Sequence, residues 1–435
     1  ASDFNYWTIL GIIGNFIFMF FMSTFLGISG GLICSLFLKI MKKFNIGLFG
    51  FGNVGRGLYD VLEQTRHPQA CIKRVCVRNI NKDRGIDAAL FTDCADDIFG
   101  DPDINMIVEL IDDAQASLSI VTRALREHKP VVTGNKHMLA HHLEELVALQ
   151  RETGTPLLYD ASACGSIPVI RNLEEYYDND LLTSVKGILN GTSNFILSKI
   201  FNENMTYPAA LKLAQDLGFA EANPTSDIEG FDSLYKLVII TVHAFGRYVQ
   251  PSDVFVYGIS TMNEADIRFA SEKGRRIKLI GHVEKLDDNR MTMCVMPQLL
   301  SRDKYIYSVE DEFNGVVIKG KYYGKQFMFG RGAGGYPTGS AVLSDIMACS
   351  YDYKYEYKKL GADTVPEYST DVYFRIYLRY ATSADLALFN FKTISESYSS
   401  DTTHYVVGDI LLSDLVRIKP QLQGRNLFIA AYPKD

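Results

Sequence analysis

The sequence has no arginine- or lysine-rich block, and its net charge of -7 is spread along the chain. Proteins that bind nucleic acid neutralise phosphates with clustered cations, so nucleic acid is not an expected partner. The seven cysteines are odd in number and scattered, and no CxxC pair occurs among them. This pattern is typical of reduced thiols in a cytoplasmic protein rather than of a disulfide framework or a zinc site.

Length and composition favour two or three folded domains. The chain has 435 residues, of which 47% are hydrophobic and 22% charged, so it can bury a core. From residue 44 short apolar runs alternate with amphipathic stretches, which is typical of βαβ units in a parallel sheet. We expect helices at 55–64 and 114–128, and in a second α/β region a long apolar helix at 231–245.

The end of the chain has a different order. Beyond the YDYKYEYKK stretch it reads strand, helix, strand, strand, helix, strand, which is the ferredoxin-like order. A glycine-rich stretch at 330–340, followed by a helical pattern at 341–350, is expected to rejoin the first domain. The predicted fold is therefore α/β: a Rossmann-type doubly wound parallel sheet, an α+β domain and a small C-terminal ferredoxin-like domain.

The first forty residues contain no charge between Asp3 and Lys39, and the run at 9–40 is long enough to cross a bilayer as a helix. One interpretation is a membrane anchor. The other is translated upstream sequence, which we favour because Met41 stands directly before the first predicted strand. A membrane is an expected partner only if residues 1–40 belong to the functional protein.

A GxGxxG pattern, Gly50-Phe51-Gly52-Asn53-Val54-Gly55, follows the first predicted strand and opens a helix. In this position glycines let the backbone turn and approach a pyrophosphate, which the helix N-terminus stabilises. The alternative is a glycine-rich turn without a ligand. The context favours a dinucleotide site.

The second predicted strand ends without the acidic residue that usually holds the ribose of NAD. Arg78 stands there, with Lys82 and Arg84 close behind. A cation suits the extra phosphate of NADP, so we expect NADP with NAD as the alternative; a solvated basic turn would give the same pattern.

Lys136 lies where a strand at 131–133 runs into a helix, at the edge of the sheet that faces the ligand crevice. Asp232 and Lys236 are four residues apart in the apolar helix, so they share one face and can pair. Charges in a helix that is apolar all round are costly unless paired and so indicate a site. The alternatives are a solvated lysine at 136 and a structural salt bridge at 232 and 236.

Six motifs, in this order, resemble those of homoserine dehydrogenases over residues 41 to about 355. They are GFGNVG at 50–55, TxNK at 133–136, DASACGSIP at 160–168, KGILNGTSN at 186–194, FAEANPTSDIEGFD..YK at 219–236 and GRGAGGYPT at 330–338. The resemblance implies NAD(P)-dependent reduction of L-aspartate 4-semialdehyde to L-homoserine, in threonine, methionine and isoleucine biosynthesis. It also implies a monofunctional form that assembles as a homodimer or higher homo-oligomer.

The resemblance further implies that Lys236 handles the proton at the substrate oxygen while Asp232 and Asp227 position lysine and substrate. Substrate contacts are implied for Glu221, Gly191, Thr192 and Lys136. The predicted cofactor-binding residues are those of the glycine turn, together with Arg78 and three further positions: Gly50, Phe51, Gly52, Asn53, Val54, Gly55, Arg78, Lys136, Gly332 and Gly334.

The sequence departs from the family pattern at several positions. Asp160 replaces a glutamate that, with carbonyls here belonging to Ala163, Gly165 and Ile167, is implied to hold a monovalent cation such as sodium; the shorter side chain puts that ion in doubt. Asp112 and Asp113 lie near the expected nicotinamide end, where they could weaken cofactor binding.

The C-terminal region is similar to ACT modules, which bind amino acids, but it lacks their glycine turn after the first strand. We expect an apolar extension at 1–40, an NAD(P)-binding domain at 41–160 and a catalytic and dimerisation domain at 161–325. A glycine loop and helix at 326–355 and an ACT-like domain at 356–435 would follow. Two rival functions stay open: another Rossmann oxidoreductase acting on an amino-acid-derived carbonyl, and a catalytically silent NADP sensor.

Overall fold

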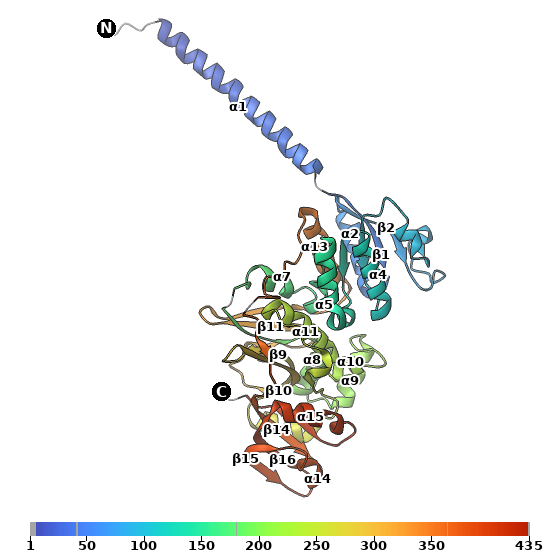
Figure 1. The fold of residues 1–435 in the computed structure, drawn as a ribbon, viewed down its shortest axis with the longest axis vertical. Coiled ribbons are helices and arrows are strands. Elements are labelled where there is room, and N and C mark those ends of the chain that lie inside the picture. The colour runs from blue at the N-terminus through green and yellow to red at the C-terminus, as the bar shows by residue number, and fades with distance from the viewer. Residues whose placement is uncertain (1–5, 41, 180, 363, 434–435) are drawn as a thin grey trace, which may run out of the picture.

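The computed structural model describes residues 6–40, 42–179, 181–362 and 364–433 (Figure 1). Met41, where the nucleotide-binding domain is predicted to begin, lies outside the described residues. Three bodies follow one another along the molecule below a projecting N-terminal helix.

The first body is a six-stranded parallel sheet in the order β3-β2-β1-β4-β5-β6, which confirms the predicted doubly wound sheet. Its strands are β1 (Phe44–Phe49), β2 (Ala70–Cys76), β3 (Phe91–Thr92), β4 (Met106–Glu109), β5 (Val131–Thr133) and β6 (Leu157–Leu158). Its main helices are α2 (Asn53–Thr65), α4 (Ala114–Arg126) and α5 (Lys136–Thr153). The central strands are buried along their whole length, because helices cover both faces of such sheets.

Helix α13 (Gly335–Ala348) comes late in the sequence but packs against α2, as Figure 1 shows. The two helices approach so closely that a Cβ atom on Gly57 would overlap the carbonyl of Gly335. The helix begins at Gly335 and not at 341 as predicted. Pro337 lies in its first turn, where proline is tolerated because amide groups there have no partner within the helix.

The second body is an antiparallel sheet in the order β12-β11-β7-β9-β10. Its strands are β7 (Leu182–Ile188), β9 (Arg276–Lys285), β10 (Arg290–Leu300), β11 (Phe313–Gly320) and β12 (Gly324–Arg331). The helices of this region are α6 (Ala161–Cys164), α7 (Val169–Glu175), α8 (Gly191–Glu203), α9 (Tyr207–Asp216), α10 (Thr225–Ile228), α11 (Phe231–Phe245) and α12 (Glu264–Glu272). The predicted helix at 231–245 is confirmed.

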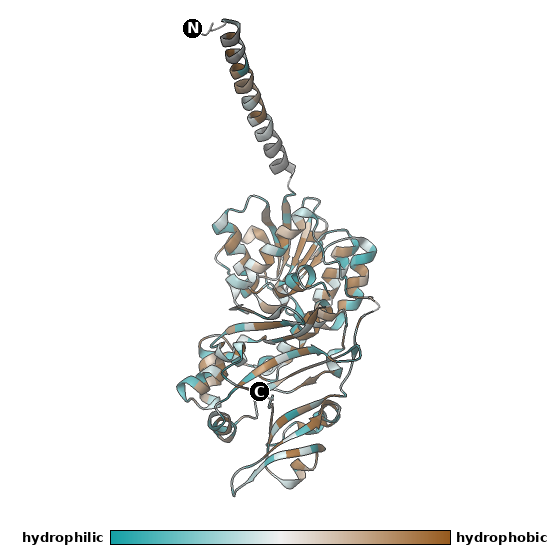
Figure 2. Ribbon diagram, turned by 90° about the vertical axis from the view of Figure 1, so that its left-hand side faces the viewer, coloured by the Kyte–Doolittle hydropathy of each residue, from teal (hydrophilic) through white to brown (hydrophobic). Residues whose placement is uncertain are grey.

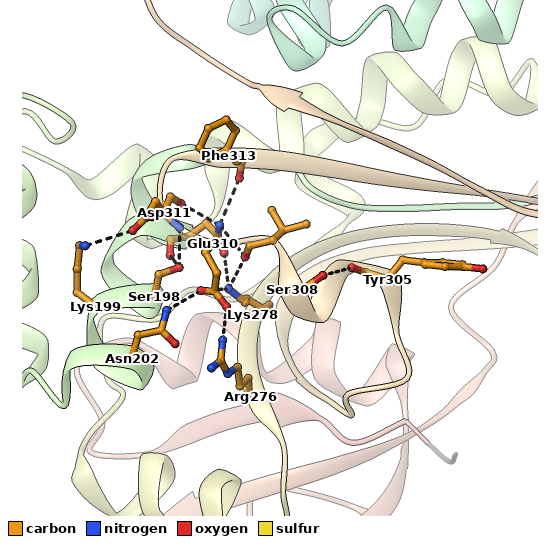
Figure 3. A network of polar contacts seen from close by, with 12 residues as sticks. Ser198, Lys199, Asn202, Arg276, Lys278, Tyr305, Ser308, Glu310, Asp311 and Phe313 are labelled. Atoms are coloured by element: carbon orange, nitrogen blue, oxygen red, sulfur yellow. Dashed lines mark hydrogen bonds and ion pairs between the residues drawn. The ribbon is translucent and has the colours of Figure 1, made fainter.

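A polar network holds α8 to this sheet (Figure 3). The buried Lys278 Nζ on β9 donates to Asn194 Oδ1 at 3.0 Å and to the Val309 carbonyl at 2.6 Å. Glu310 lies 3.4 Å from the same nitrogen and pairs with Arg276. Burial lowers the pKa of Lys278 to about 8. Asn194, part of the NGTSN motif, therefore stabilises the packing of α8 against the sheet.

The C-terminal body has the predicted order of elements: β14 (Tyr373–Tyr380), α14 (Ser383–Leu386), β15 (Phe391–Ser399), β16 (His404–Leu411), α15 (Leu412–Leu422) and β17 (Phe428–Ala431). Its antiparallel sheet runs β17-β14-β16-β15, and the pairing of Ala431 with Gln298 on β10 joins it to the second body. The order of elements is confirmed, while the resemblance to ACT modules stays a prediction.

Helix α1 (Tyr6–Ile40) stands clear of the three bodies (Figure 2). Its segment Ile13–Gly31 is long and apolar enough to span a membrane. Large side chains along it, such as Phe16 and Phe18, are exposed.

Candidate active site

The GxGxxG turn forms one end of a groove of about 940 Å³ at the carboxyl edge of the parallel sheet. Gly50 has φ +92°, and a Cβ atom there would lie 2.6 Å from the Leu110 carbonyl oxygen. A Cβ atom on Gly52 would meet open space, so the backbone at that position is accessible to a ligand. The predicted residues that line the groove are Gly50, Phe51, Gly52, Asn53, Val54, Arg78 and Glu221.

Arg78 and Asp113 both line this groove and form an ion pair. Arg78 Nη2 lies 2.9 Å from Asp113 Oδ2, and Asp113 Oδ1 accepts from the backbone N–H of Ala116 at 3.0 Å. The Ala116 N–H, and then the Arg78 guanidinium, lower the pKa of Asp113. Asp113 therefore caps helix α4 and balances Arg78, a role that the sequence did not indicate.

Two predicted lysines, Lys236 from the same helix and Lys136 from a distant part of the sequence, meet at the carboxylate of Asp232. Asp232 Oδ2 lies 2.7 Å from Lys236 Nζ, and Asp232 Oδ1 lies 2.9 Å from Lys136 Nζ. Asp232 is 4% exposed, and Lys236 is buried too. Lys236 Nζ also donates to the Leu189 carbonyl at 2.7 Å. The side chain of Lys136 is 40% exposed, against 8% for that of Lys236.

The electrostatics of this cluster favour an ionised Asp232. Burial opposes its charge, but Lys136 and Lys236 outweigh burial and hold the pKa of Asp232 far below its usual range. The Asp232 carboxylate in turn raises the pKa of Lys136. Burial, and then repulsion from Asp232, raises the pKa of Asp227. The site therefore holds a fixed anion between two ammonium groups, with a more easily protonated carboxyl beside it.

Asn190 joins these groups and was not predicted. Its Nδ2 donates to Asp227 Oδ1 at 2.6 Å and to Asp232 Oδ2 at 2.9 Å, while its Oδ1 caps α8 by accepting from the Ser193 N–H at 2.8 Å. An asparagine directly before a helix is a recognised cap, but nothing in the sequence indicated the two carboxylates.

Gly191 and Thr192 form the first turn of α8, next to Asn190. A Cβ atom on Gly191 would lie 2.6 Å from the Glu312 carbonyl oxygen, so only glycine fits there. Thr192 Oγ1 donates to the Phe219 carbonyl at 2.6 Å, which ties the turn to the segment before Glu221. These predicted substrate residues thus border the Asp232 cluster.

The glycine loop before α13 meets the segment that follows β6. Gly165 has φ +54°, and a Cβ atom on it would lie 2.6 Å from the carbonyl carbon of Gly332. The Ser166 N–H donates to the Arg331 carbonyl at 3.0 Å, and Gly334 has φ +117°. The loop therefore lies between the two large bodies.

The predicted cation ligands are partly engaged elsewhere. Asp160 Oδ1 accepts from the backbone N–H groups of Ile170 and Arg171, at 2.8 and 3.1 Å, so it serves the N-terminal end of α7. The Ile167 carbonyl accepts from the Val169 N–H at 2.8 Å. Burial raises the pKa of Asp160, which weakens it further as a ligand. Two of the four predicted ligands, Asp160 and Ile167, therefore already accept backbone hydrogen bonds.

The opposite end of α11 is fixed by a buried polar chain. His243 Nδ1 lies 2.6 Å from Glu174 Oε1, and His243 Nε2 lies 2.9 Å from Tyr159 Oη, which contacts Tyr357 Oη at 2.8 Å. The helix that carries Asp232 and Lys236 is thus held at both ends, and the two side chains keep their positions.

Family models match most of the chain outside its two ends. The model "Homoserine dehydrogenase, NAD binding domain" matches residues 50–160, and the model "Homoserine dehydrogenase" matches residues 168–347. The homoserine dehydrogenase of Bacillus subtilis is 38% identical over 317 residues, which are 71% of this chain and 73% of that protein. The Helicobacter pylori enzyme is 36% identical over 313 residues, 70% of this chain and 73% of that protein.

Solved structures give the same result. The homoserine dehydrogenase of Thiobacillus denitrificans superposes with a TM-score of 0.78 at 29% identity, covering 91% of this chain and 99% of that one. A hyperthermophilic archaeal homoserine dehydrogenase mutant in complex with NADPH has a TM-score of 0.60 at 25% identity, covering 72% of this chain and 99% of that one.

Proposed function

The chain belongs to the homoserine dehydrogenase family, and we propose that its active site lies where the glycine-turn groove meets the Asp232 cluster. It is an NAD(P)-dependent oxidoreductase that interconverts L-aspartate 4-semialdehyde and L-homoserine, a step in threonine, methionine and isoleucine biosynthesis. The observation that supports the location is the buried Asp232 carboxylate held between Lys136 and Lys236.

The residues of the groove fit a dinucleotide. The turn from Gly50 to Val54 would hold the pyrophosphate, the Gly332 to Gly334 loop would cover the cofactor, and Arg78 would face the ribose phosphate of NADP. Arg78 supports NADP over NAD, and one archaeal relative was solved with NADPH. When bound, the nicotinamide supplies the hydride that reduces the aldehyde carbon.

Lys236 is the proposed proton donor to the oxygen of the reacting carbonyl. Its ammonium is fixed by the Leu189 carbonyl and by Asp232, so two of its three N–H groups are oriented and the third can be directed at substrate. Asp232 pairs with both lysines, and Asn190 fixes Asp232 and Asp227 relative to each other by donating to both. The protein contributes orientation and a positioned proton.

Substrate binding is assigned to the residues around this donor. Glu221 would pair with the ammonium group of the amino-acid substrate, and Lys136 would meet its carboxylate or the cofactor. The turn at Gly191 and Thr192 would close one side of the pocket. The cluster thus offers charges of both signs, as a zwitterionic substrate requires.

Further proposals concern assembly and organisation. We expect a homodimer or higher homo-oligomer in the cytoplasm, the domain limits predicted from the sequence, and a membrane contact only through α1. The C-terminal body would be ACT-like; calorimetry with threonine tests whether it binds an effector, and no binding at millimolar concentration means a structural role. No step uses the cation, because Asp160 Oδ1 and the Ile167 carbonyl already accept backbone hydrogen bonds.

The deciding experiment is homoserine oxidation with NADP and, separately, with NAD. We expect turnover with both and a lower KM for NADP. A panel of other aldehydes and keto acids excludes a different carbonyl substrate, and binding of NADP without any turnover would instead favour the silent sensor.

A further inference from the structure

The one-turn helix α10, which carries Asp227, contacts the segment that runs from the last residue of β8 (Phe255–Val256) toward α12. The Ile259 N–H donates to the Ile228 carbonyl at 2.8 Å. A Cβ atom on Gly258 would overlap the same carbonyl, so the two backbones touch. A shift of this segment, residues 256–262, must therefore move the residue next to Asp227.

The same segment is fastened to the C-terminal body at two points. Tyr257 Oη donates to the Leu427 carbonyl at 3.0 Å and contacts Thr261 Oγ1 at 2.8 Å. Arg379 Nη2 on β14 donates to the Thr261 carbonyl at 2.7 Å. Residues 256–262 thus lie between the C-terminal body and the proposed substrate site, bonded to both.

Arg379 is itself held firmly, because each of its three guanidinium nitrogens has a hydrogen-bond partner. It is 4% exposed, its Nε lies 2.9 and 3.0 Å from the two carboxylate oxygens of Asp266, and its Nη1 donates to Asn426 Oδ1 at 2.9 Å. Asp266 also accepts from the Asn263 N–H at 2.8 Å and so caps the N-terminal end of α12. A planar guanidinium with fixed partners holds the groups bonded to it in place better than a flexible ammonium group would.

We propose that Tyr257 and Arg379 are positioning residues through which the C-terminal body holds α10, and with it Asp227, in place for the substrate. The inference rests on the proposed role of Asp227. It gives the C-terminal body a part in substrate binding that requires no effector. Since the cofactor groove is lined by other segments, the effect should fall on the substrate and leave the cofactor unaffected.

The test uses the full chain and the variants Tyr257→Phe and Arg379→Lys. We expect the KM for homoserine to rise about three- to ten-fold in Tyr257→Phe, the usual range for one lost hydrogen bond, and further in Arg379→Lys. The kcat should stay within about two-fold and the Kd for NADP unchanged. Tyr405→Phe is the matched control, because it removes a tyrosine hydroxyl bond to Glu396 inside the C-terminal body.

Hydrogen exchange of residues 225–230 provides the second readout. It should become faster in Tyr257→Phe and stay at the wild-type rate in Tyr405→Phe. An unchanged homoserine KM in an active Tyr257→Phe enzyme, or equal effects of the two tyrosine variants, would overturn the inference. If the wild type does not oxidise homoserine, the proposed function fails, and exchange at 225–230 alone decides whether the C-terminal body holds α10.

Discussion

Replacing Lys236 by alanine tests the assignment of the proton donor. Loss of a positioned proton donor costs about 10²–10⁴-fold in rate, equivalent to about 3–5 kcal/mol of transition-state free energy. The Kd for NADP should stay within about two-fold, because Lys236 lies in α11 while the proposed cofactor site is the groove at the glycine turn. The measurement is kcat and KM for homoserine oxidation beside a fluorescence titration of the cofactor.

The Lys236→Ala variant should fold, because the Asp232 carboxylate keeps other partners. Removing one member of a buried ion pair costs about 3–5 kcal/mol when the remaining charge has no partner. Here Asp232 retains Lys136 and Asn190, each at 2.9 Å, so we expect a loss of about 1–3 kcal/mol, arising chiefly from the Leu189 carbonyl and the cavity. Thermal unfolding measures this loss.

Two further variants complete the test. Lys212→Ala removes an exposed lysine with the same four-residue spacing to an aspartate, and should leave both rate and stability unchanged. Asp232→Asn should lower the rate of homoserine oxidation less than Lys236→Ala does. An amide can still orient the lysines, but it carries no negative charge to pair with them. A folded Lys236→Ala enzyme that oxidises homoserine within a few-fold of the wild-type rate would refute the assignment and leave a structural salt bridge.

Other predictions follow from the remaining contacts. A chain without residues 1–40 should be soluble and fully active, since α1 stands clear of the three bodies (Figure 2); loss of folding or activity on removal contradicts this. Arg78→Ala should raise the KM for NADP about ten-fold more than that for NAD, measured with both cofactors; equal changes would mean that Arg78 only balances Asp113. The free energy of unfolding of Lys278→Met should differ from that of the wild type by an amount that depends on pH. Above pH 8 the folded wild type has lost a proton that the unfolded chain keeps to about pH 10.5. The free energy of unfolding of the wild type therefore rises over that window by up to about 3 kcal/mol. Urea unfolding of both proteins at pH 7.5 and pH 10 checks this, and a constant difference would refute it.

What the sequence could predict depends on short-range patterns. The parallel sheet follows from alternating apolar runs, and α11 follows from an apolar stretch bounded by Gly230 and Gly246. The pairing of Asp232 with Lys236 follows from the helical repeat. These features are local, so their period and spacing are visible in one chain.

The rest of the site depends on contacts between distant segments. Lys136 reaches Asp232 only because α5 packs against α11, and Arg78 meets Asp113 only because β2 and β4 flank β1. Asn190 was visible as a helix cap, but its two carboxylate partners depend on how α8, α10 and α11 converge. No periodicity in the sequence encodes such distances.

The energetics of the charge cluster indicate that it serves the reaction more than the stability of the fold. A buried ion pair is seldom more stable than well-packed apolar side chains of the same volume, because desolvation cancels most of the attraction. The alternation of Lys136, Asp232 and Lys236 therefore adds little to the stability of α11, whose remaining faces are apolar and already buried. It does fix two ammonium groups beside one carboxylate, one of them buried and the other partly exposed. Such an arrangement is costly for a fold and useful for a reaction in which an oxygen gains a proton as its carbon gains a hydride.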